Sequence, residues 1–542
     1  MDKKTFLAIA LSLILVIAYQ YFFIEPPVPG DVAEEQNGSG VLVTEEERQP
    51  APTPPAAAAP GDAGPVPAFS ADETEKGREV RVSGPLYTAV LSTRGAGIVS
   101  LKLEQYRQTL DDDSGLIELV NVRDGMPYPL TVTFPDSGMD IPAGAVYKAD
   151  RESVDLDRGE SESIVFTKTY PGRMTVEKVY TFYRDSYAFD FEIRVRNLSE
   201  ETVTQTAGIL WSDYLDPDVR VDRFSHVGPV AYVGDDLVTE NPKKLDETKY
   251  YGPGVLWAGY QTKYFIASVI SQQPSLTSAV VAKSSSNDVF VSLRGPRVMI
   301  PPGESGTFRY NCYLGPKEYD ILKSQQVNLE SSIDFGSWIK WLSLPLLKAL
   351  KLINGFVHNY GLAIIILTIF VKVIFWPLGT MSYKSMKNMQ KIQPEMQKLR
   401  EKYKDDKAKM QEETMSLYKA YKVNPLGGCL PILIQIPVFF GLYRALLYSI
   451  ELRHSPFFFW IQDLSAKDPY YITPIIMGAS MYLQQKMMPT PSTNELQAKI
   501  MTWMPVAFTF LFLNFPAGLV LYWLFNNIIS VGQQYWINKR TN

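Results

Sequence analysis

The sequence contains very few of the side chains on which metal sites, disulfide frameworks and most nucleophilic active sites depend. Its 542 residues include 2 cysteines and 3 histidines. Two cysteines cannot form a disulfide framework or a four-thiolate metal site, and three histidines leave little for metal ligation. The dipeptide Gly-Lys does not occur, which excludes a Walker-type phosphate-binding loop. We therefore expect no cofactor and no bound metal, and a metalloenzyme is unfavoured.

Charge is divided unevenly along the chain, although the net charge is only -5. Residues 5–332 contain 29 basic and 46 acidic side chains, whereas residues 333–542 contain 22 basic and 11 acidic side chains. With 46% apolar residues over this length, the chain is expected to form more than one domain, at about 150 residues per domain. The opposite charges predict that the two regions face different surroundings.

An uncharged apolar segment lies close to the N-terminus. Residues 5–24 contain no charged side chain and are long enough to cross a hydrocarbon layer of about 30 Å at about 1.5 Å per residue. A cleavable signal peptide is the alternative, but its apolar stretch is about 7–15 residues long and ends in small residues. Because this segment ends in Tyr19-Gln20-Tyr21-Phe22-Phe23, we interpret residues 1–24 as an uncleaved transmembrane anchor.

A linker and a strand-rich domain follow the anchor. Residues 25–77 are rich in Pro, Ala, Gly and Glu and predict a disordered linker. Beyond it the apolar residues alternate with polar ones, most clearly at Tyr187, Phe189, Phe191, Ile193 and Val195, as in a strand with one buried face. Similar runs occur at 80–104, 162–183, 203–213, 255–270, 278–282 and 288–300. They predict an antiparallel β-sandwich over residues 78–325, outside the cytoplasm.

The predicted sandwich offers no recognisable active site. Its only histidine is His226, and none of its many carboxylates belongs to a motif with a base or a nucleophile. Trp211, Trp257 and Tyr260 could line a cleft for a sugar or a peptide, but aromatic residues in strands belong more often to the core. We therefore predict a solvated acidic surface and no site in this domain.

The remaining chain has the pattern of a membrane-embedded helical bundle. Residues 326–360 predict connecting helices and an amphipathic interfacial helix, in which tryptophan and leucine side chains oppose lysines. Residues 361–542 predict a five-helix core, with apolar segments at 361–378, 430–450, 471–488, 500–516 and 518–537. Together with the anchor, the chain is predicted to have six transmembrane helices.

Positive charge predicts which side of the membrane each loop occupies. Eleven basic residues lie between Lys384 and Lys422, whereas residues 451–470 contain only Arg453 and Lys467. Since cytoplasmic loops carry the excess of Lys and Arg, we expect residues 379–424 in the cytoplasm, as a helical hairpin broken at Asp405-Asp406. Two interpretations of this hairpin stay open: a solvated basic surface, or a methionine-containing surface that docks varied partners.

One lysine lies inside a predicted span. Lys372 belongs to the run IILTIFVKVIFWPL, and a lysine at the centre of a membrane helix costs about 2.5–3.5 kcal/mol. No later span contains Asp or Glu in its interior, so we expect Lys372 to face a water-filled groove. The alternative is that its side chain extends to the cytoplasmic headgroups. The other polar residues of this predicted groove are Thr368, on the same helix face, and Gln435, Asn514, Tyr522, Asn526 and Asn527.

Three segments carry a resemblance to a known family. They are residues 422–446 (KVNPLGGCLPILIQIPVFFGLYRAL), 455–478 (SPFFFWIQDLSAKDPYYITPIIMG) and 504–528 (MPVAFTFLFLNFPAGLVLYWLFNNI). They resemble the YidC/Oxa/Alb family of membrane protein insertases, and the order of anchor, large outer domain and five-span core resembles its members from Gram-negative bacteria. The resemblance implies an insertase and chaperone that moves hydrophilic client segments across the inner leaflet while the apolar client helix leaves sideways into lipid.

The resemblance also implies roles for individual residues and a set of partners. Lys372 occupies the position of the family's positive groove residue, and Phe439, Val506, Phe508 and Leu511 occupy client-contacting positions. The outer domain is similar to a galactose-mutarotase-like supersandwich. The implied partners are nascent inner-membrane proteins, the Sec translocon, membrane lipids, and the ribosome and signal recognition particle receptor at the hairpin, without direct nucleic acid binding. The implied location is the bacterial inner membrane, with both termini cytoplasmic and the β-domain periplasmic.

An insertase without enzymatic activity is the first interpretation, because polar groups in a groove and a cytoplasmic hairpin serve binding and transfer, and two other functions are its alternatives. A secondary transporter or channel could use Lys372 to bind an anion, but it would normally show paired repeats with broken helices, and no such repeat is evident. An intramembrane protease is motivated by Gly478-Ala479-Ser480, but His358 and His454 both lie outside the predicted spans.

Overall fold

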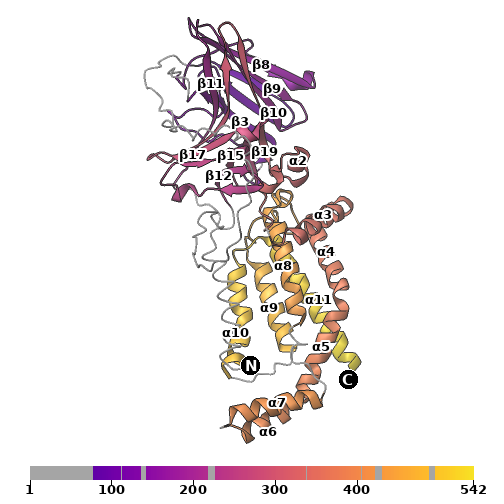
Figure 1. The fold of residues 1–542 in the computed structure, drawn as a ribbon. Coiled ribbons are helices and arrows are strands. Elements are labelled where there is room, and N and C mark those ends of the chain that lie inside the picture. Colours follow the sequence, from indigo (N-terminus) through magenta and orange to yellow (C-terminus); the bar gives the residue numbers. More distant parts are fainter. Residues whose placement is uncertain are drawn as a thin grey trace, which may run out of the picture. The chain divides into compact units, whose positions relative to one another are not determined.

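The computed structural model describes residues 77–541 except 112, 136–141, 218–225, 337, 405, 422–429 and 488–494. The predicted anchor at 1–24 lies outside the described residues, as does all but the last residue of the predicted linker at 25–77. Figure 1 shows strands in the indigo-to-magenta part of the described chain and helices in the orange-to-yellow part.

The strand-rich part contains a large antiparallel sheet. Its order is β13 (Asp236–Thr239), β12 (Gly228–Val233), β15 (Val255–Gln261), β16 (Phe265–Ser271), β19 (Ser305–Pro316), β10 (Ala188–Asn197), β9 (Met174–Tyr183), β8 (Ser161–Tyr170) and β6 (Lys148–Ala149). Each neighbouring pair in this sheet is antiparallel.

Two smaller sheets accompany it. One has the order β4 (Leu116–Glu118), β3 (Ile98–Arg107), β2 (Tyr87–Ser92), β1 (Glu79–Ser83) and β7 (Ser153–Asp155). The other has the order β14 (Lys249–Tyr251), β17 (Ser278–Lys283), β18 (Asp288–Ile300), β11 (Val203–Tyr214) and β5 (Thr131–Thr133). Buried residues from all three sheets form one hydrophobic core, so the predicted β-sandwich is confirmed.

Strand β10 has the alternating burial that its sequence pattern predicted. Phe189, Phe191, Ile193 and Val195 are all buried, while the residues between them are exposed or half-buried. The ring of Phe191 stacks on that of Tyr180 from β9, with 4.5 Å between the centroids. Cross-strand aromatic contacts of this kind stabilise a sheet beyond the burial of area alone.

Strand β19 was not among the predicted strands. This strand lies between β16 and β10 in the large sheet, and its Phe308, Tyr310 and Cys312 are buried. Thr307, Arg309 and Asn311 separate them, so the strand has the same period-two pattern as β10. The signal was present in the sequence, immediately after the turn at residues 301–304.

The rest of the described chain is helical. The helices are α2 (Tyr319–Ser324), α3 (Lys340–Val357), α4 (Tyr360–Ile374), α5 (Trp376–Lys391), α6 (Gln393–Lys402), α7 (Lys407–Ala420), α8 (Leu430–Tyr448), α9 (Ile472–Met487), α10 (Glu495–Phe512) and α11 (Ala517–Thr541). Asn359 caps α4 by accepting a hydrogen bond from the Leu362 amide at 3.0 Å. The predicted helical region at the C-terminal end is confirmed.

The first predicted core span is bent. Helices α4 and α5 meet at Phe375 with an angle of 63° between them. Pro377 explains the break, because a proline inside a continuous helix clashes with the carbonyl four residues earlier. Among the described residues no single helix is both long and apolar enough to cross a membrane, but α4 and α5 taken together reach that length and hydropathy. The total of six spans stays a prediction.

The β-domain buries two lysines, Lys178 and Lys317. Lys178 is 1% exposed, donates a hydrogen bond from Nζ to the Gly95 carbonyl at 2.5 Å, and lies 4.8 Å from the centroid of the Tyr147 ring. Burial lowers the pKa of Lys178 to about 7. Lys317 is buried as well, and burial, opposed in part by the charge of Asp334, lowers its pKa to about 7.

These lysines predict that the β-domain becomes more stable as the pH rises. A lysine in the unfolded chain has a pKa of about 10.4, so between about pH 7 and pH 10 the unfolded chain binds more protons than the folded chain. The free energy of unfolding therefore increases across that range. We expect Lys178→Met to remove roughly half of the increase, since Lys317 remains. Circular dichroism melting of the β-sheet signal in detergent would test this. The exposed Lys148→Met is the control, and an unchanged pH dependence in Lys178→Met would contradict the prediction.

Candidate functional site

Lys372 lies in the last turn of α4, immediately before the bend. Its side chain is half-buried, and Nζ donates a hydrogen bond to Oγ of Ser530 on α11 at 2.7 Å. Within the described part of the chain, no Asp or Glu forms an ion pair with it. The charge of this lysine is thus held by a neutral hydroxyl, a partner that the sequence did not predict.

A short relay of hydrogen bonds continues from Ser530 to a third helix. The Ser530 hydroxyl donates to the carbonyl oxygen of Asn526, one turn earlier on α11, at 2.7 Å. The side-chain oxygen of Asn526 accepts a hydrogen bond from Nε2 of Gln435 on α8. Three of the predicted groove residues, Lys372, Gln435 and Asn526, are therefore joined through Ser530.

The other predicted groove residues have separate positions. Asn527 is buried and donates from Nδ2 to Oγ of Ser480 on α9 at 3.2 Å. Thr368 is also buried, and its hydroxyl donates back to the Ile364 carbonyl of its own helix at 2.6 Å. Tyr522 is buried on α11, whereas Asn514 is exposed beyond the end of α10.

Ser480 is the serine that motivated the protease alternative. Its hydroxyl donates to the Met477 carbonyl at 2.6 Å and accepts from the Asn527 amide at 3.2 Å. Neither partner can act as a general base. The geometry therefore gives this serine a packing role between α9 and α11.

Two further polar residues on α11 were missed by the sequence interpretation. Gln533 donates from Nε2 to the Trp376 carbonyl at 3.0 Å and to Oγ1 of Thr380 at 3.3 Å, both on α5. Gln534 donates from Nε2 to the Met487 carbonyl at the end of α9 at 2.5 Å. A polar residue recurs every three or four positions along α11, and this spacing was the signal that could have found them.

The predicted client-contacting residues fall into two groups. The ring of Trp523 on α11 contacts the ring of Phe439 at 4.7 Å, that of Phe512 at 5.3 Å and that of Phe508 at 6.3 Å between centroids. Phe439 and Phe508 thus meet at one tryptophan, which was not predicted. Val506 and Leu511 instead lie on the outward face of α10 and are 40% and 37% exposed.

Large apolar side chains are exposed on several helices of the core. On α10 they include Trp503 and Phe510, each 67% exposed, and on α4 they include Phe370, Val373 and Ile374. Exposed groups of this size are unfavourable in water. They are the expected surface of helices in contact with lipid.

The loop that precedes α9 is fixed by a buried carboxylate. Asp468 is 1% exposed and accepts hydrogen bonds from the amide of Thr473 at 2.7 Å, the amide of Tyr470 at 2.9 Å and Nε1 of Trp460 at 3.1 Å. Carbonyl oxygens of the same loop accept hydrogen bonds from the amides of Ala517 and Gly518, the first two residues of α11. The loop at 451–470 is therefore tied to the beginnings of both α9 and α11.

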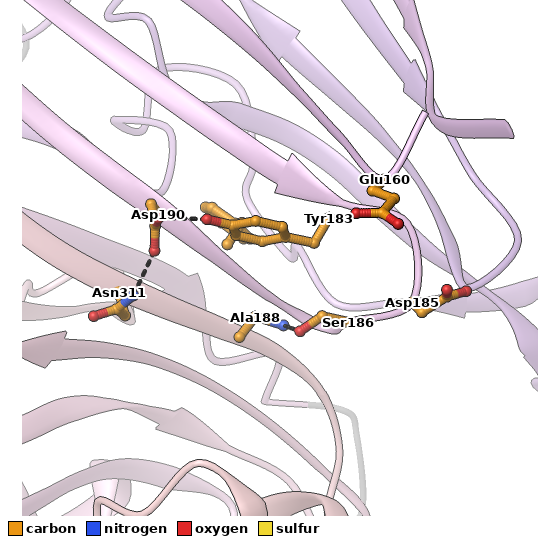
Figure 2. Close-up of a pocket in the computed structure, with 8 residues that line it drawn as sticks. Glu160, Tyr183, Asp185, Ser186, Ala188, Asp190 and Asn311 are labelled. Atoms are coloured by element: carbon orange, nitrogen blue, oxygen red, sulfur yellow. Dashed lines mark hydrogen bonds between the residues drawn. The ribbon is translucent and has the colours of Figure 1, made fainter. Parts of the chain in front are cut away.

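The β-domain contains a pocket of about 490 Å³ at the turn between β9 and β10. Figure 2 shows the carboxylates of Glu160, Asp185 and Asp190 around it. Asp190 accepts hydrogen bonds from the Tyr183 hydroxyl at 2.7 Å and from Nδ2 of Asn311 at 2.5 Å. Both of its oxygens are occupied, so the carboxylate has a structural role in the sheet.

His226 and the metal-ligating side chain types are the candidates for an alternative site in the described chain. Nε2 of His226 lies 3.2 Å from the carbonyl oxygen of Pro229, and burial lowers the pKa of the His226 imidazole. No group of three or more His, Cys, Asp or Glu side chains could hold a metal ion within the residues that the structure describes. The interhelical polar contacts around Lys372 are therefore the candidate functional site.

Comparison with known proteins gives the family. Residues 352–542 match the family described as 60Kd inner membrane protein, and residues 79–349 match the family described as YidC periplasmic domain. The membrane protein insertase YidC of Syntrophus aciditrophicus is 54% identical over 544 residues, covering 100% of both chains.

Solved structures with some likeness were also found. The active YidC insertase crystal structure with the first transmembrane domain resolved is 20% identical, covers 85% of this chain and 92% of its own, and has a TM-score of 0.36. A galactose mutarotase-like protein from Lactobacillus casei is 11% identical, covers 44% of this chain and 99% of its own, and has a TM-score of 0.33.

The ring contacts predict that Trp523 holds three helices together. Trp523→Ala would remove its contacts with Phe439 of α8 and with Phe508 and Phe512 of α10. Loss of a large packed side chain destabilises by about 3 kcal/mol in soluble cores, and somewhat less where lipid can fill the space. We expect a lower melting temperature in detergent, measured by size-exclusion chromatography after heating. Trp503→Ala on the exposed face of α10 is the matched control, and equal melting temperatures for the two variants would refute the role of Trp523.

Proposed function

Because the chain belongs to the YidC family of membrane protein insertases, we propose that it inserts membrane proteins into the bilayer by receiving their hydrophilic segments at Lys372. The observation that supports this most directly is the environment of that lysine. It is half-buried, carries a positive charge and has a neutral side-chain partner on another helix. Insertion in this way requires binding and transfer, and no covalent chemistry.

The charge of Lys372 defines the client segments that the site favours. An ammonium group without a carboxylate partner attracts acidic segments, and the attraction strengthens as the local dielectric constant falls. Gln435 and Asn526 add amide groups that can exchange their mutual hydrogen bond for bonds to a client backbone. Each backbone group that stays unpaired in hydrocarbon costs several kcal/mol. A polar site in the inner leaflet would lower that cost.

The apolar part of a client would leave through the side of the core. Phe439 and Phe508 lie at the Trp523 cluster, and Val506 and Leu511 face outward on α10. We propose that a client helix passes these four residues on its way from the polar site into lipid. Their aromatic and aliphatic side chains are compatible with many client sequences.

We also propose that the site opens to the cytoplasm and to lipid and is closed on the periplasmic side. Lys372 precedes α5, which continues into the basic helices α6 and α7. At the N-terminal end of α11, the loop at 451–470 is fixed through Asp468 and through hydrogen bonds from the amides of Ala517 and Gly518. This arrangement supports a path from the cytoplasm that does not continue into a pore.

We also propose that the chain has six spans in the bacterial inner membrane, with both termini in the cytoplasm and the β-domain in the periplasm. Its proposed partners are the Sec translocon, the ribosome and the signal recognition particle receptor. On α7, Met415 is 50% exposed and supports a docking role for the hairpin. Met389, Ile392 and Met396 form its small core, and the Tyr421 hydroxyl donates to Glu395 at 2.7 Å.

The transporter alternative finds little support in the helices. Transporters with inverted repeats contain broken helices at corresponding positions in both halves. Among the described residues one bent pair, α4 and α5, combines a break with the length and hydropathy of a span. This single break at Phe375 is explained by Pro377 two residues later.

The proposal predicts that the charge of Lys372 matters more than its shape. Lys372→Arg should insert clients within about threefold of the unchanged chain, because the charge is kept. Lys372→Ala and Lys372→Glu should lose at least about tenfold, or about 1.4 kcal/mol. Proteoliposomes and protease protection of a one-span client with an acidic translocated segment provide the measurement. Lys384→Glu, at an exposed position of α5, is the control. Normal insertion by Lys372→Glu would reject the proposal.

A second prediction concerns access to the site. In a Cys312→Ser, Cys429→Ser background, Lys372→Cys should react with a charged maleimide added from the cytoplasmic side and resist the reagent added outside. Thr368→Cys should react slowly from both sides, because Thr368 is 1% exposed. Phe459→Cys, in the loop at 451–470 and 85% exposed, should react from outside. Equal labelling of Lys372→Cys from both sides would indicate a channel.

A further inference from the structure

We infer that Ser530 is a positioning residue that holds the ammonium group of Lys372 where client segments arrive. This inference rests on the function proposed above and adds a residue to it. Ser530 lies on α11, 158 residues away from Lys372 in the sequence, and its Oγ is 2.7 Å from Nζ. Its side chain is only 3% exposed, so solvent does not compete freely for the hydroxyl.

The orientation of the Ser530 hydroxyl is fixed by its own helix. A serine hydroxyl has a single hydrogen to donate and two lone pairs that accept. The hydrogen is directed to the Asn526 carbonyl at 2.7 Å, a common bond for serine inside a helix. The lone pairs consequently face away from that carbonyl. The hydroxyl accepts from the ammonium of Lys372, and the Tyr383 side chain on α5 also interacts with it.

A lysine requires such a partner more than an arginine would. Its ammonium is a compact charge on a flexible stem of four carbons, whereas the guanidinium of arginine presents five donors in a rigid plane. Within the described residues, Ser530 is the one hydrogen-bond acceptor that the structure gives Lys372. Two of the three ammonium hydrogens then remain available for a client carboxylate or backbone carbonyl.

The position of Ser530 is in turn tied to α8. Gln435 donates to the side chain of Asn526, and the main chain of Asn526 accepts from Ser530. The place of the charge is therefore set by α4, α8 and α11 together. A client that takes the hydrogen bonds of Gln435 and Asn526 would meet the ammonium at a defined distance.

The competing explanation is that Ser530 only packs α11 against α4. Ser480 offers a matched control for that role. It is a hydroxyl on α9 that contacts the same helix, through Asn527, without touching Lys372. Loss of either hydroxyl removes one interhelical hydrogen bond, but only the loss of Ser530 should depend on the residue at position 372.

A double-mutant cycle tests this dependence. We expect Ser530→Ala to slow insertion of the acidic one-span client about fivefold, the effect of one net hydrogen bond, and Ser530→Thr to restore most of the rate. Combined with Lys372→Arg or with Lys372→Met, the same Ser530→Ala change should alter the rate less than about twofold. Ser480→Ala should have equal effects in all three backgrounds.

The outcomes separate the inference from the proposed function. Loss on Ser530→Ala that is confined to the chain with Lys372 supports positioning. No loss, or the same loss in every background, overturns it, including the case in which Ser530→Ala simply impairs folding. The proposed function is tested independently by Lys372→Glu, so it can stand when the positioning role of Ser530 fails.

Discussion

The helical core depends on one constraint: a polar group among apolar helices must find its hydrogen-bond partner within the protein, because lipid offers none. Helix α11 meets this demand for four of its neighbours. Its side chains bond α8 through Asn526, α4 through Ser530, α9 through Asn527 and Gln534, and α5 through Gln533. Helix α10 differs, since its described contacts with α11 are aromatic rings around Trp523. Polar contacts thus specify the arrangement along most of α11, and apolar ring contacts surround it at Trp523.

This division is suited to the two parts of a membrane protein client. A hydrophilic segment needs hydrogen-bonding groups, and in the proposed site the amides of Gln435 and Asn526, which pair with each other, provide them. An apolar segment needs only contact without specific geometry, which rings and aliphatic chains supply. The two surfaces meet on α11, where Asn526 and Trp523 are three residues apart and therefore lie on nearly the same face.

The sequence predicted the elements better than their partners. Alternation in β10 identified a strand and its buried face, but β19, its neighbour in the sheet, is more than 100 residues away, and no local pattern states that pairing. Lys372 was found because a charge in an apolar run is rare. Ser530 was not, because a serine in a helix usually bonds its own backbone, and only the fold shows that it also accepts from a lysine on α4. The bend after α4 could have been predicted from Pro377, although its angle depends on packing.

Two lysines with similar hydrogen bonds differ in burial, and burial determines what each charge can reach. Lys178 and Lys372 each donate to a neutral oxygen, the Gly95 carbonyl and the Ser530 hydroxyl. Lys178 is enclosed on all sides by the β-domain core and can only influence stability. Lys372 is half-buried and held by a side chain that belongs to a different helix. Had that partner been a carboxylate, the ion pair would have neutralised the charge and reduced its attraction for client segments. A neutral hydroxyl holds the ammonium while leaving its charge available, as the proposed binding of client segments requires.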